Sequence, residues 1–191
     1  MELVFATNNK HKLEEIQNLL GDKIQLLSLN DISFFEEIPE DFDTLQENAL
    51  QKARHIYDKF KRNCFADDTG LEIDFLKGAP GVMSARYAGL NCSFEDNVVK
   101  VLNELEGAEN RKARFRTVIA LILNGKEYFF EGIVDGEILT NNHGTGGFGY
   151  DPVFRPLGYD KSFAEMEMNE KNEISHRARA AFKLVDFLKN Q

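Results

Sequence analysis

Apolar and polar positions along the chain predict alternating strands and helices. Residues 3–7 form a short, nearly continuous apolar run, which is typical of a strand buried on both faces. Residues 11–20 have the spacing of a helix that ends at Gly21. Residues 24–29 predict a second strand, and a polar, acidic segment follows at residues 30–43.

A longer amphipathic segment follows Thr44. Its apolar residues recur at spacings of three and four, which places them on one helix face: Leu45, Ala49, Ala53, Ile56 and Phe60. Thr44 with Glu47 three positions later matches a capping box. Residues 64–67 predict the next strand, which Asp68-Thr69-Gly70 is expected to stop. Residues 94–105 predict a helix that ends at Gly107.

The clearest local signal is a hairpin. Residues 118–123 and 126–130 are rich in strand-forming side chains, and Asn124-Gly125 joins them. A glycine-dense segment at residues 144–150 leads into an expected short strand at residues 151–154. A last helix is expected to be capped near Ser175, with an apolar stripe of Ala178, Phe182, Val185 and Leu188. One compact α/β domain over residues 1–191, with a mixed sheet, accounts for this pattern.

Composition narrows the class of protein. Two cysteines, Cys64 and Cys92, are too few for a disulfide scaffold, and Cys64 lies in an apolar run typical of a buried side chain. No run approaches the roughly 20 apolar residues of a membrane span, and the N-terminus has no basic leader before an apolar run. These features favour a cytoplasmic protein without a membrane partner. The net charge of −9 argues against a polymeric nucleic acid but not against a small nucleotide.

The first candidate for chemistry is the segment from Thr7 to Lys12, where a strand end leads into a helix. Backbone N–H groups at a helix N-terminus favour an anion, Asn9 can donate amide hydrogens, and Lys12 supplies a full positive charge. A phosphate is a reasonable occupant. An ordinary strand-to-helix turn is the alternative.

The second candidate is the pair Asp67 and Asp68. Adjacent carboxylates at the end of a buried strand are costly to desolvate unless a cation lies there, and oxygen ligands of this kind suit Mg²⁺. An acidic turn is the alternative. Glu40 could supply another carboxylate, although Glu36 and Glu37 are neighbours that compete for the role.

Two further candidates lie in the second half of the chain. Phe148, between glycines, is a poor core anchor and a good surface for stacking a base, and Asp151 follows as an acceptor. The alternative is a tight turn with an incidental phenylalanine. Lys171 precedes His176 and Arg177, a cationic pair that the dipole disfavours at a helix start. Such a violation points to function, against the alternative of a solvent-exposed basic helix start.

Taken together and in this order, the motifs resemble the inosine triphosphate pyrophosphatase family, known in bacteria as the dITP/XTP pyrophosphatases. The matching segments cover essentially the whole chain: Ala6-Thr7-x-Asn9-x-x-Lys12-x-x-Glu15, Glu47-Asn48-Ala49-x-x-Lys52-Ala53, Ala66-Asp67-Asp68-Thr69-Gly70-Leu71, Gly78-Ala79-Pro80-Gly81-x-x-Ser84-Ala85-Arg86-Tyr87, Gly144-Thr145-Gly146-Gly147-Phe148-Gly149-Tyr150-Asp151-Pro152 and Ser175-His176-Arg177. Each segment is modestly specific, and the ordered set is highly specific. Thr69 stands where many bacterial members carry serine, which keeps the hydroxyl.

The resemblance implies a two-lobed α/β fold on a long mixed sheet flanked by helices, and a homodimer. It implies Mg²⁺-dependent hydrolysis of noncanonical purine nucleoside triphosphates (ITP, dITP and XTP) to the monophosphate and pyrophosphate. Asp68 would be the general base, linked to a metal that Glu40 and Asp68 bind. The residues expected to contact substrate are Thr7, Asn8, Asn9, Lys10, His11, Lys12, Lys52, Thr69, Phe148, Gly149, Tyr150, Asp151, Lys171, His176 and Arg177.

Physical chemistry supports this choice of base. Hypoxanthine and xanthine carry an oxygen at position 6, to which His176 or Arg177 could donate, whereas adenine presents a donor there. A general nucleoside triphosphatase, a pyrophosphatase for modified pyrimidines, a regulatory nucleotide-binding module and a structural domain are the competing interpretations. The retained Asp67, Asp68, Lys12 and Lys52 argue against a regulatory module without turnover. The polar breaks in the apolar periodicity argue against a structural domain.

Overall fold

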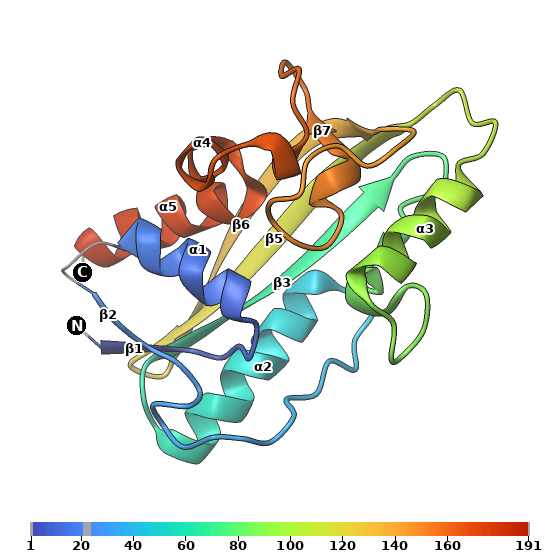
Figure 1. The fold of residues 1–191 in the computed structure, drawn as a ribbon. Coiled ribbons are helices and arrows are strands. Elements are labelled where there is room, and N and C mark those ends of the chain that lie inside the picture. Colours follow the sequence, from blue (N-terminus) through green and yellow to red (C-terminus); the bar gives the residue numbers. More distant parts are fainter. Residues whose placement is uncertain (1, 21–23, 191) are drawn as a thin grey trace. The chain divides into compact units, whose positions relative to one another are not determined.

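A computed structural model of the chain describes residues 2–20 and 24–190 (Figure 1). The chain forms two compact units. The first comprises Met1–Asp68, Thr117–Gly132 and Arg177–Gln191, and the second comprises Thr69–Arg116 and Ile133–His176. No helix within the described ranges has the length and apolar character that a membrane crossing requires.

Three strands begin in one unit and end in the other: β3 (Cys64–Ile73), β5 (Lys112–Leu123) and β6 (Lys126–Ile138). The first unit adds β1 (Glu2–Phe5), α1 (Lys10–Leu20), β2 (Gln25–Leu27), α2 (Leu45–Phe60) and nearly all of α5 (His176–Lys189). The second unit adds β4 (Pro80–Gly81), η1 (Ser84–Arg86), α3 (Phe94–Glu104), η2 (Asp151–Val153), β7 (Phe154–Pro156), η3 (Phe163–Glu165) and α4 (Met168–Ile174).

The sheet is mixed. Its strands are hydrogen-bonded in the order β2-β1-β3-β5-β6-β7, with β4 paired to β3 off this path. The pairs β1–β2 and β1–β3 are parallel, whereas β3–β4 and β6–β7 are antiparallel. The predicted α/β class with a mixed sheet flanked by helices is therefore confirmed.

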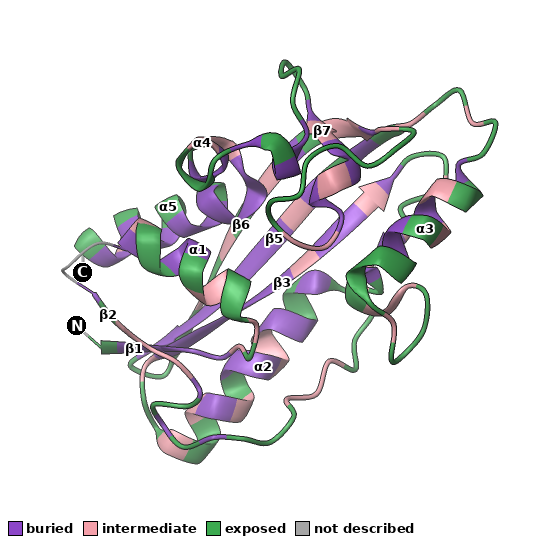
Figure 2. Cartoon of the chain, viewed as in Figure 1, coloured by how far each residue is buried: buried purple, intermediate pink, exposed green. Residues whose placement is uncertain are grey.

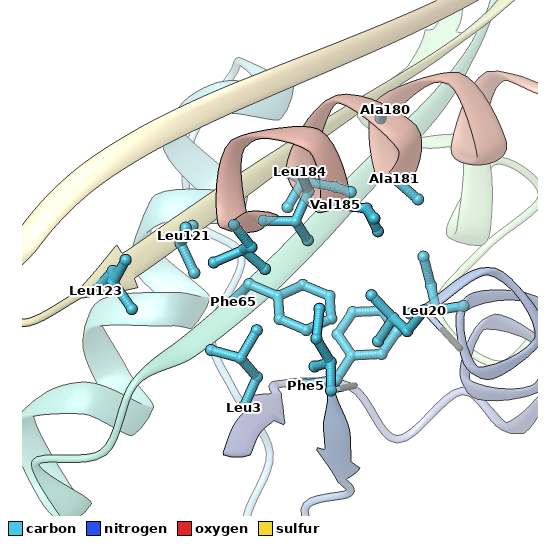
Figure 3. Close-up of a cluster of buried hydrophobic side chains, with 14 residues drawn as sticks. Leu3, Phe5, Leu20, Phe65, Leu121, Leu123, Ala180, Ala181, Leu184 and Val185 are labelled. Carbon is cyan, nitrogen blue, oxygen red and sulfur yellow. The ribbon is translucent and has the colours of Figure 1, made fainter. Parts of the chain in front are cut away.

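The core of the first unit has two layers because successive strand residues point to opposite faces of a sheet. Odd-numbered positions such as Leu3, Phe5 and Phe65 pack with α1 and α5, and the rings of Phe5 and Phe65 stack at 4.5 Å (Figure 3). Even-numbered positions such as Val4 and Ala66 pack with α2. Figure 2 shows the strands as mostly buried and the helices as partly exposed. The alternation also decides to which face each polar side chain of β3 points.

The second unit has its own core around three phenylalanines. Phe115 contacts Phe154 at 4.6 Å between ring centroids, and Phe154 contacts Phe163 at 5.2 Å. Apolar side chains of α3, including Val98 and Val101, complete this cluster.

The predicted end of β3 at Asp68-Thr69-Gly70 is wrong, because the strand continues to Ile73. Its second half pairs with β4, in which Gly81 lies opposite Leu71. A Cβ added to Gly70 would lie 2.8 Å from the carbonyl oxygen of Gly81. The glycine therefore permits the close approach of β4, rather than ending the strand.

Other boundary predictions need smaller corrections. Ile24 lies outside β2, which covers Gln25–Leu27, and the predicted strand at residues 151–154 is a 3₁₀ turn followed by β7. Phe182 is 47% exposed and does not belong to the buried stripe of α5. It lies beside the helix face whose residues are buried, such as Ala178, Ala181 and Leu184.

Within the described residues, the observed helix ends agree well with those that the sequence predicted. Thr44 caps α2 by accepting a hydrogen bond from the backbone N–H of Glu47, but the Glu47 carboxylate bonds the Thr44 hydroxyl instead of completing a capping box. The helix α3 ends at Glu104, close to its predicted end. Gly21, the predicted end of the first helix, lies outside the described residues.

The predicted hairpin is confirmed. Asn124 and Gly125 both have positive φ, 51° and 78°, as a two-residue type I′ turn requires. The strands on either side, β5 and β6, extend well beyond the apolar runs that predicted them.

We expect the two cysteines to differ sharply in reactivity. Cys64 is fully buried, and burial raises the pKa of its thiol to about 12, whereas Cys92 is half-buried. Only the thiolate reacts, so at pH 8 Cys64 should hold roughly a thousandfold less thiolate than a free cysteine. Ellman's reagent should therefore modify one thiol in the native protein and two in guanidinium chloride.

The variant Cys92→Ser isolates Cys64. At pH 8 its native form should react with almost no reagent, and its reactivity should rise as the pH approaches 11. Rapid modification of one full equivalent in native Cys92→Ser at pH 8 would contradict the deep burial of Cys64.

Candidate active site

The first set of candidate residues lies past the end of β1. This strand ends at Phe5, opposite Phe65 of β3, and the chain then turns into α1. Asp67 and Asp68 therefore extend beyond the edge of β1 while remaining in β3. Both are buried, at 1% and 7% exposure, and their side chains point to opposite faces of the sheet.

Asp67 lies on the face covered by α1 and α5, where its carboxylate bridges two cations. One oxygen, Oδ1, accepts a hydrogen bond from Lys12 Nζ at 2.9 Å, and Oδ2 accepts one from Arg177 Nε at 3.2 Å. The guanidinium of Arg177 also donates through Nη1 to Glu15 Oε2. Charges of alternating sign therefore run from Lys12 through Asp67 and Arg177 to Glu15, and the chain of ion pairs is electrically neutral.

Asp68 lies on the face covered by α2. The ammonium of Lys52 lies 3.6 Å from Asp68 Oδ1 and also donates to Glu40 Oε1. Lys52 is buried, and the Glu40 side chain is 29% exposed. Two carboxylates, those of Glu40 and Asp68, thus approach the same ammonium ion.

Glu40 is placed by the helix that carries Lys52. Asn48 of α2 both donates to and accepts from the backbone of Phe42, at 3.0 and 2.9 Å. Gln51 accepts a hydrogen bond from the backbone N–H of Asp41 and donates one to the Asp41 carboxylate. These two side chains fasten the acidic segment to α2 directly after Glu40.

The competing glutamates are located elsewhere. Glu36 forms an exposed ion pair with Lys59, and Glu37 is exposed. Of the three glutamates that the sequence left open, Glu40 is the one beside Lys52 and Asp68.

The turn from Thr7 to Lys12 is organised by Asn9. Its side-chain oxygen accepts hydrogen bonds from the backbone N–H groups of His11 and Lys12, at 3.0 and 3.2 Å, so Asn9 is the N-cap of α1. The hydroxyl of Thr7 accepts from the N–H of Asn9 at 3.2 Å. Because the cap uses the oxygen of Asn9, its NH₂ group, which can only donate, is the part suited to an anion.

The surroundings shift the pKa values of the two aspartates in opposite directions. Burial alone would raise the pKa of Asp67, but the cations of Lys12 and Arg177 outweigh it and hold that pKa below its usual range. Burial raises the pKa of Asp68, because Lys52 compensates the carboxylate only in part. Consecutive residues of one strand therefore occupy opposite electrostatic environments.

The second set of candidates surrounds the glycine loop, residues 144–150. Asp151 is 3% exposed, and its Oδ2 accepts from Phe148 N at 2.9 Å and from Lys171 Nζ at 2.7 Å. The Lys171 ammonium also lies 5.2 Å from the centroid of the Phe148 ring. Gly147 has φ of 68°, and a Cβ there would lie 2.1 Å from the Asp151 carboxylate, so only glycine fits.

His176 joins this set through aromatic contacts. It is 3% exposed and stacks on Phe115, with ring centroids 4.5 Å apart and an interplanar angle of 16°. Phe163 lies 6.1 Å from the His176 ring and 5.6 Å from the Lys171 ammonium. The basic start of α5 is therefore buried, which excludes the alternative of a solvent-exposed basic helix start.

Tyr150 and the segment at residues 78–87 are held together by hydrogen bonds within the second unit. The Tyr150 hydroxyl donates to the backbone oxygen of Ser84 at 2.8 Å. The Ser84 hydroxyl in turn donates to Gly81 O at 2.6 Å and accepts from Leu71 N at 2.9 Å. These bonds tie η1 to β3 and to the end of the glycine loop.

The structure thus groups the predicted residues into two sets. The first unit carries two ion-pair networks on opposite faces of β3, and we call them together the charged cluster: Lys12, Asp67, Arg177 and Glu15 on one face, and Lys52, Asp68 and Glu40 on the other. The second unit groups Phe148, Asp151, Lys171 and His176, while Thr69 is half-buried in β3 and Gly149 is half-buried in the loop. Asn8, Lys10 and His11 are exposed around the start of α1.

Some residues of these sets were not assigned a role from the sequence. Glu15 lies in the first motif, and its position one helical turn after Lys12 is a signal that could have found it. Asn48, which bonds the backbone of Phe42, lies in the motif that begins at Glu47. Phe163 and Phe94, which contacts Phe148, have no sequence signal, because only the folded chain brings them to these positions.

The donors beside Lys52 fit a hard divalent cation. Glu40 and Asp68 present carboxylate oxygens, the ligand type that Mg²⁺ prefers, and Mg²⁺ commonly binds one or two carboxylates together with substrate phosphates. Within residues 2–20 and 24–190, no group of three or more His, Cys, Asp or Glu side chains is arranged to hold a metal by itself.

Comparison with known proteins identifies close relatives over the full chain. The model of the Ham1 family matches residues 3–187. A dITP/XTP pyrophosphatase of Flavobacterium johnsoniae is 53% identical over 188 residues, covering 98% of each chain. Another of Porphyromonas gingivalis is also 53% identical, covering 98% of this chain and 97% of its own. A solved HAM1 protein of Coxiella burnetii is 39% identical, with a TM-score of 0.91 and complete coverage of both chains.

Arg177 should contribute strongly to stability through its buried ion pairs. The substitution Arg177→Met leaves the carboxylates of Glu15 and Asp67 buried without their shared guanidinium, so we expect a loss of about 3–5 kcal/mol in unfolding free energy. Urea denaturation followed by circular dichroism measures this loss.

Arg54→Met is the matched control. Arg54 makes two hydrogen bonds to Glu127, at 2.6 and 3.0 Å, but its side chain is 56% exposed, so its removal should cost less than about 1 kcal/mol. Equal losses for the two variants would contradict the claim that the buried pairs dominate.

Proposed function

Because the chain belongs to the Ham1 family, we propose that it is a hydrolase that cleaves ITP, dITP and XTP to the nucleoside monophosphate and pyrophosphate. Such an enzyme removes noncanonical purine nucleotides from the nucleotide pool. The resemblance inferred from the motifs is confirmed at the level of the family. Relatives named dITP/XTP pyrophosphatase, aligned over nearly the whole chain, support this substrate class.

One observation carries this proposal: two carboxylates and the buried ammonium of Lys52 converge on one face of β3, while Lys12 lies on the other face beside Asp67. Cations near a strand end and a helix N-terminus suit a polyphosphate. Oxygen ligands beside them suit the Mg²⁺ that accompanies it. We therefore assign the triphosphate to Lys12, Lys52 and the turn that begins at Thr7.

We assign the purine base to the second set. Phe148 offers a ring for stacking, and Lys171 and His176 offer donors for an oxygen at position 6. Asp151 holds both Phe148 and Lys171 in place. Adenine presents an amino group where hypoxanthine and xanthine present an oxygen, so donor would face donor, and sites that read a hydrogen bond reject such mismatches strongly.

Asp68 is the proposed general base. It would accept a proton from the water that attacks the α-phosphorus, while Lys12 and Lys52 stabilise charge on the departing pyrophosphate. Mg²⁺ held by Glu40 and Asp68 would neutralise phosphoryl charge and acidify the attacking water. Arg177, buried beside Asp67, would add positive charge at the same strand end, and Thr69 would contact substrate through its hydroxyl.

The remaining assignments rest on the family resemblance. We propose a homodimer, one functional domain over residues 1–191, and a cytoplasmic location, with no polymeric nucleic acid or membrane as partner. The family match across residues 3–187 supports the single domain. Two cysteines that form no disulfide support a reducing compartment.

The direct test is pyrophosphate release from ITP, XTP, GTP and ATP, with Mg²⁺ and with a chelator. We expect rapid release from ITP and XTP, little from GTP and ATP, and none with chelator. Asp68→Asn should lower kcat roughly 100- to 10,000-fold because it removes the general base while keeping the shape of the side chain.

Glu36→Gln is the matched carboxylate control, because Glu36 pairs with Lys59 at the surface. Its activity should equal that of the unmodified protein. Equal turnover of all four nucleotides, or orthophosphate as the product, would mean that the specificity or the cleavage site is assigned wrongly.

A further inference from the structure

The ring of Phe148 is contacted by residues from outside its own loop. Gly147 and Gly149 flank it with φ of 68° and 63°, and the backbone N–H of Phe148 donates to Asp151. That hydrogen bond orders the backbone, whereas the groups in contact with the ring orient the side chain about its own torsions. A stacking surface with a defined orientation therefore depends on what touches the ring.

Two contacts join the glycine loop, and the residues just before it, to the start of α3. Phe94, the first residue of α3, lies 5.9 Å from Phe148 between ring centroids, with an interplanar angle of 49°. This distance falls within the range of favourable aromatic pairs. A few residues earlier, Asn142 Nδ2 lies 3.4 Å from both carboxylate oxygens of Glu95.

The helix that carries Phe94 has a well-defined start. Ser93 caps α3 and forms a complete capping box with Asp96, in which each side chain bonds the other residue's backbone N–H. Phe94 is thus presented from the rigid first turn of a helix. The Lys171 ammonium, 5.2 Å from the Phe148 ring, supplies a further contact from α4.

Core packing does not explain Phe94. Its side chain is 47% exposed, and it is absent from the cluster in which Val98 and Val101 of the same helix are buried. Leaving a large aromatic side chain in water forgoes the stabilisation that burial would give. Its aromatic ring instead contacts the ring of Phe148.

We propose that Phe94 is a positioning residue that holds the Phe148 ring in the orientation needed to stack on the purine base. This inference rests on the proposed function and extends it, because it gives α3 a part in base recognition. Loss of one aromatic pair corresponds to a roughly threefold to tenfold change in affinity. Replacing Phe94 should weaken binding of the base and leave binding at the charged cluster unchanged.

The test measures binding of the two products separately. Inosine monophosphate carries the base, whereas pyrophosphate does not, and isothermal titration calorimetry gives the affinity of each in the presence of Mg²⁺. The variants are Phe94→Ala, Phe94→Tyr, which keeps the ring, and Val99→Ala as a matched control. Val99 lies on the same helix and is 45% exposed.

We expect Phe94→Ala to bind inosine monophosphate roughly threefold to tenfold more weakly, with unchanged affinity for pyrophosphate. The KM for ITP should rise by a similar factor, with kcat altered less than about twofold. Phe94→Tyr should restore both values, and Val99→Ala should match the unmodified protein.

Two results would overturn the inference: unchanged affinity of Phe94→Ala for inosine monophosphate, or an equal loss of affinity for pyrophosphate. Pyrophosphate release from ITP by the unmodified protein is measured first, and it could be absent. That result would overturn the proposed function, and the inference with it, whereas normal turnover with an inert Phe94→Ala overturns the inference alone.

Discussion

The charged cluster depends on the alternation of side chains along β3. Because neighbouring strand residues point to opposite faces, Asp67 faces α1 and α5 while Asp68 faces α2. Each carboxylate therefore meets its own cations, and the two are not forced together as a repelling pair. A helix or a turn at this position would not separate adjacent residues in this way.

The two faces differ in how completely charge is compensated. Asp67 bridges Lys12 and Arg177 at hydrogen-bonding distance, whereas the Lys52 ammonium lies 3.6 Å from Asp68 and is shared with Glu40. Burial raises the pKa of Asp68 despite the nearby Lys52, so its ionised form destabilises the fold, and such groups are found mainly at functional sites. We therefore assign a positioning role to Asp67 and the chemistry to Asp68.

The sequence predicted the hairpin at Asn124-Gly125 and the buried face of α2 because both follow from local spacing and turn geometry. It placed the end of β3 wrongly, because Gly70 also marks a close approach of β4 that only tertiary pairing reveals. Residue chemistry at a helix start and a strand end predicted most of the charged cluster, the family resemblance added Lys52, and Glu15 was not assigned a role. Their division between two faces, and the contacts of Phe94, depend on packing between segments distant in sequence.

Unfolding free energies of Asp67→Asn and Asp68→Asn at neutral pH test this division of roles most directly. Asp67→Asn should lose about 3–5 kcal/mol, because buried Arg177 and half-buried Lys12 lose their shared carboxylate. Asp68→Asn should be unchanged or more stable, because it removes a charge that its surroundings compensate only in part. Equal losses, or a larger loss for Asp68→Asn, would contradict the account.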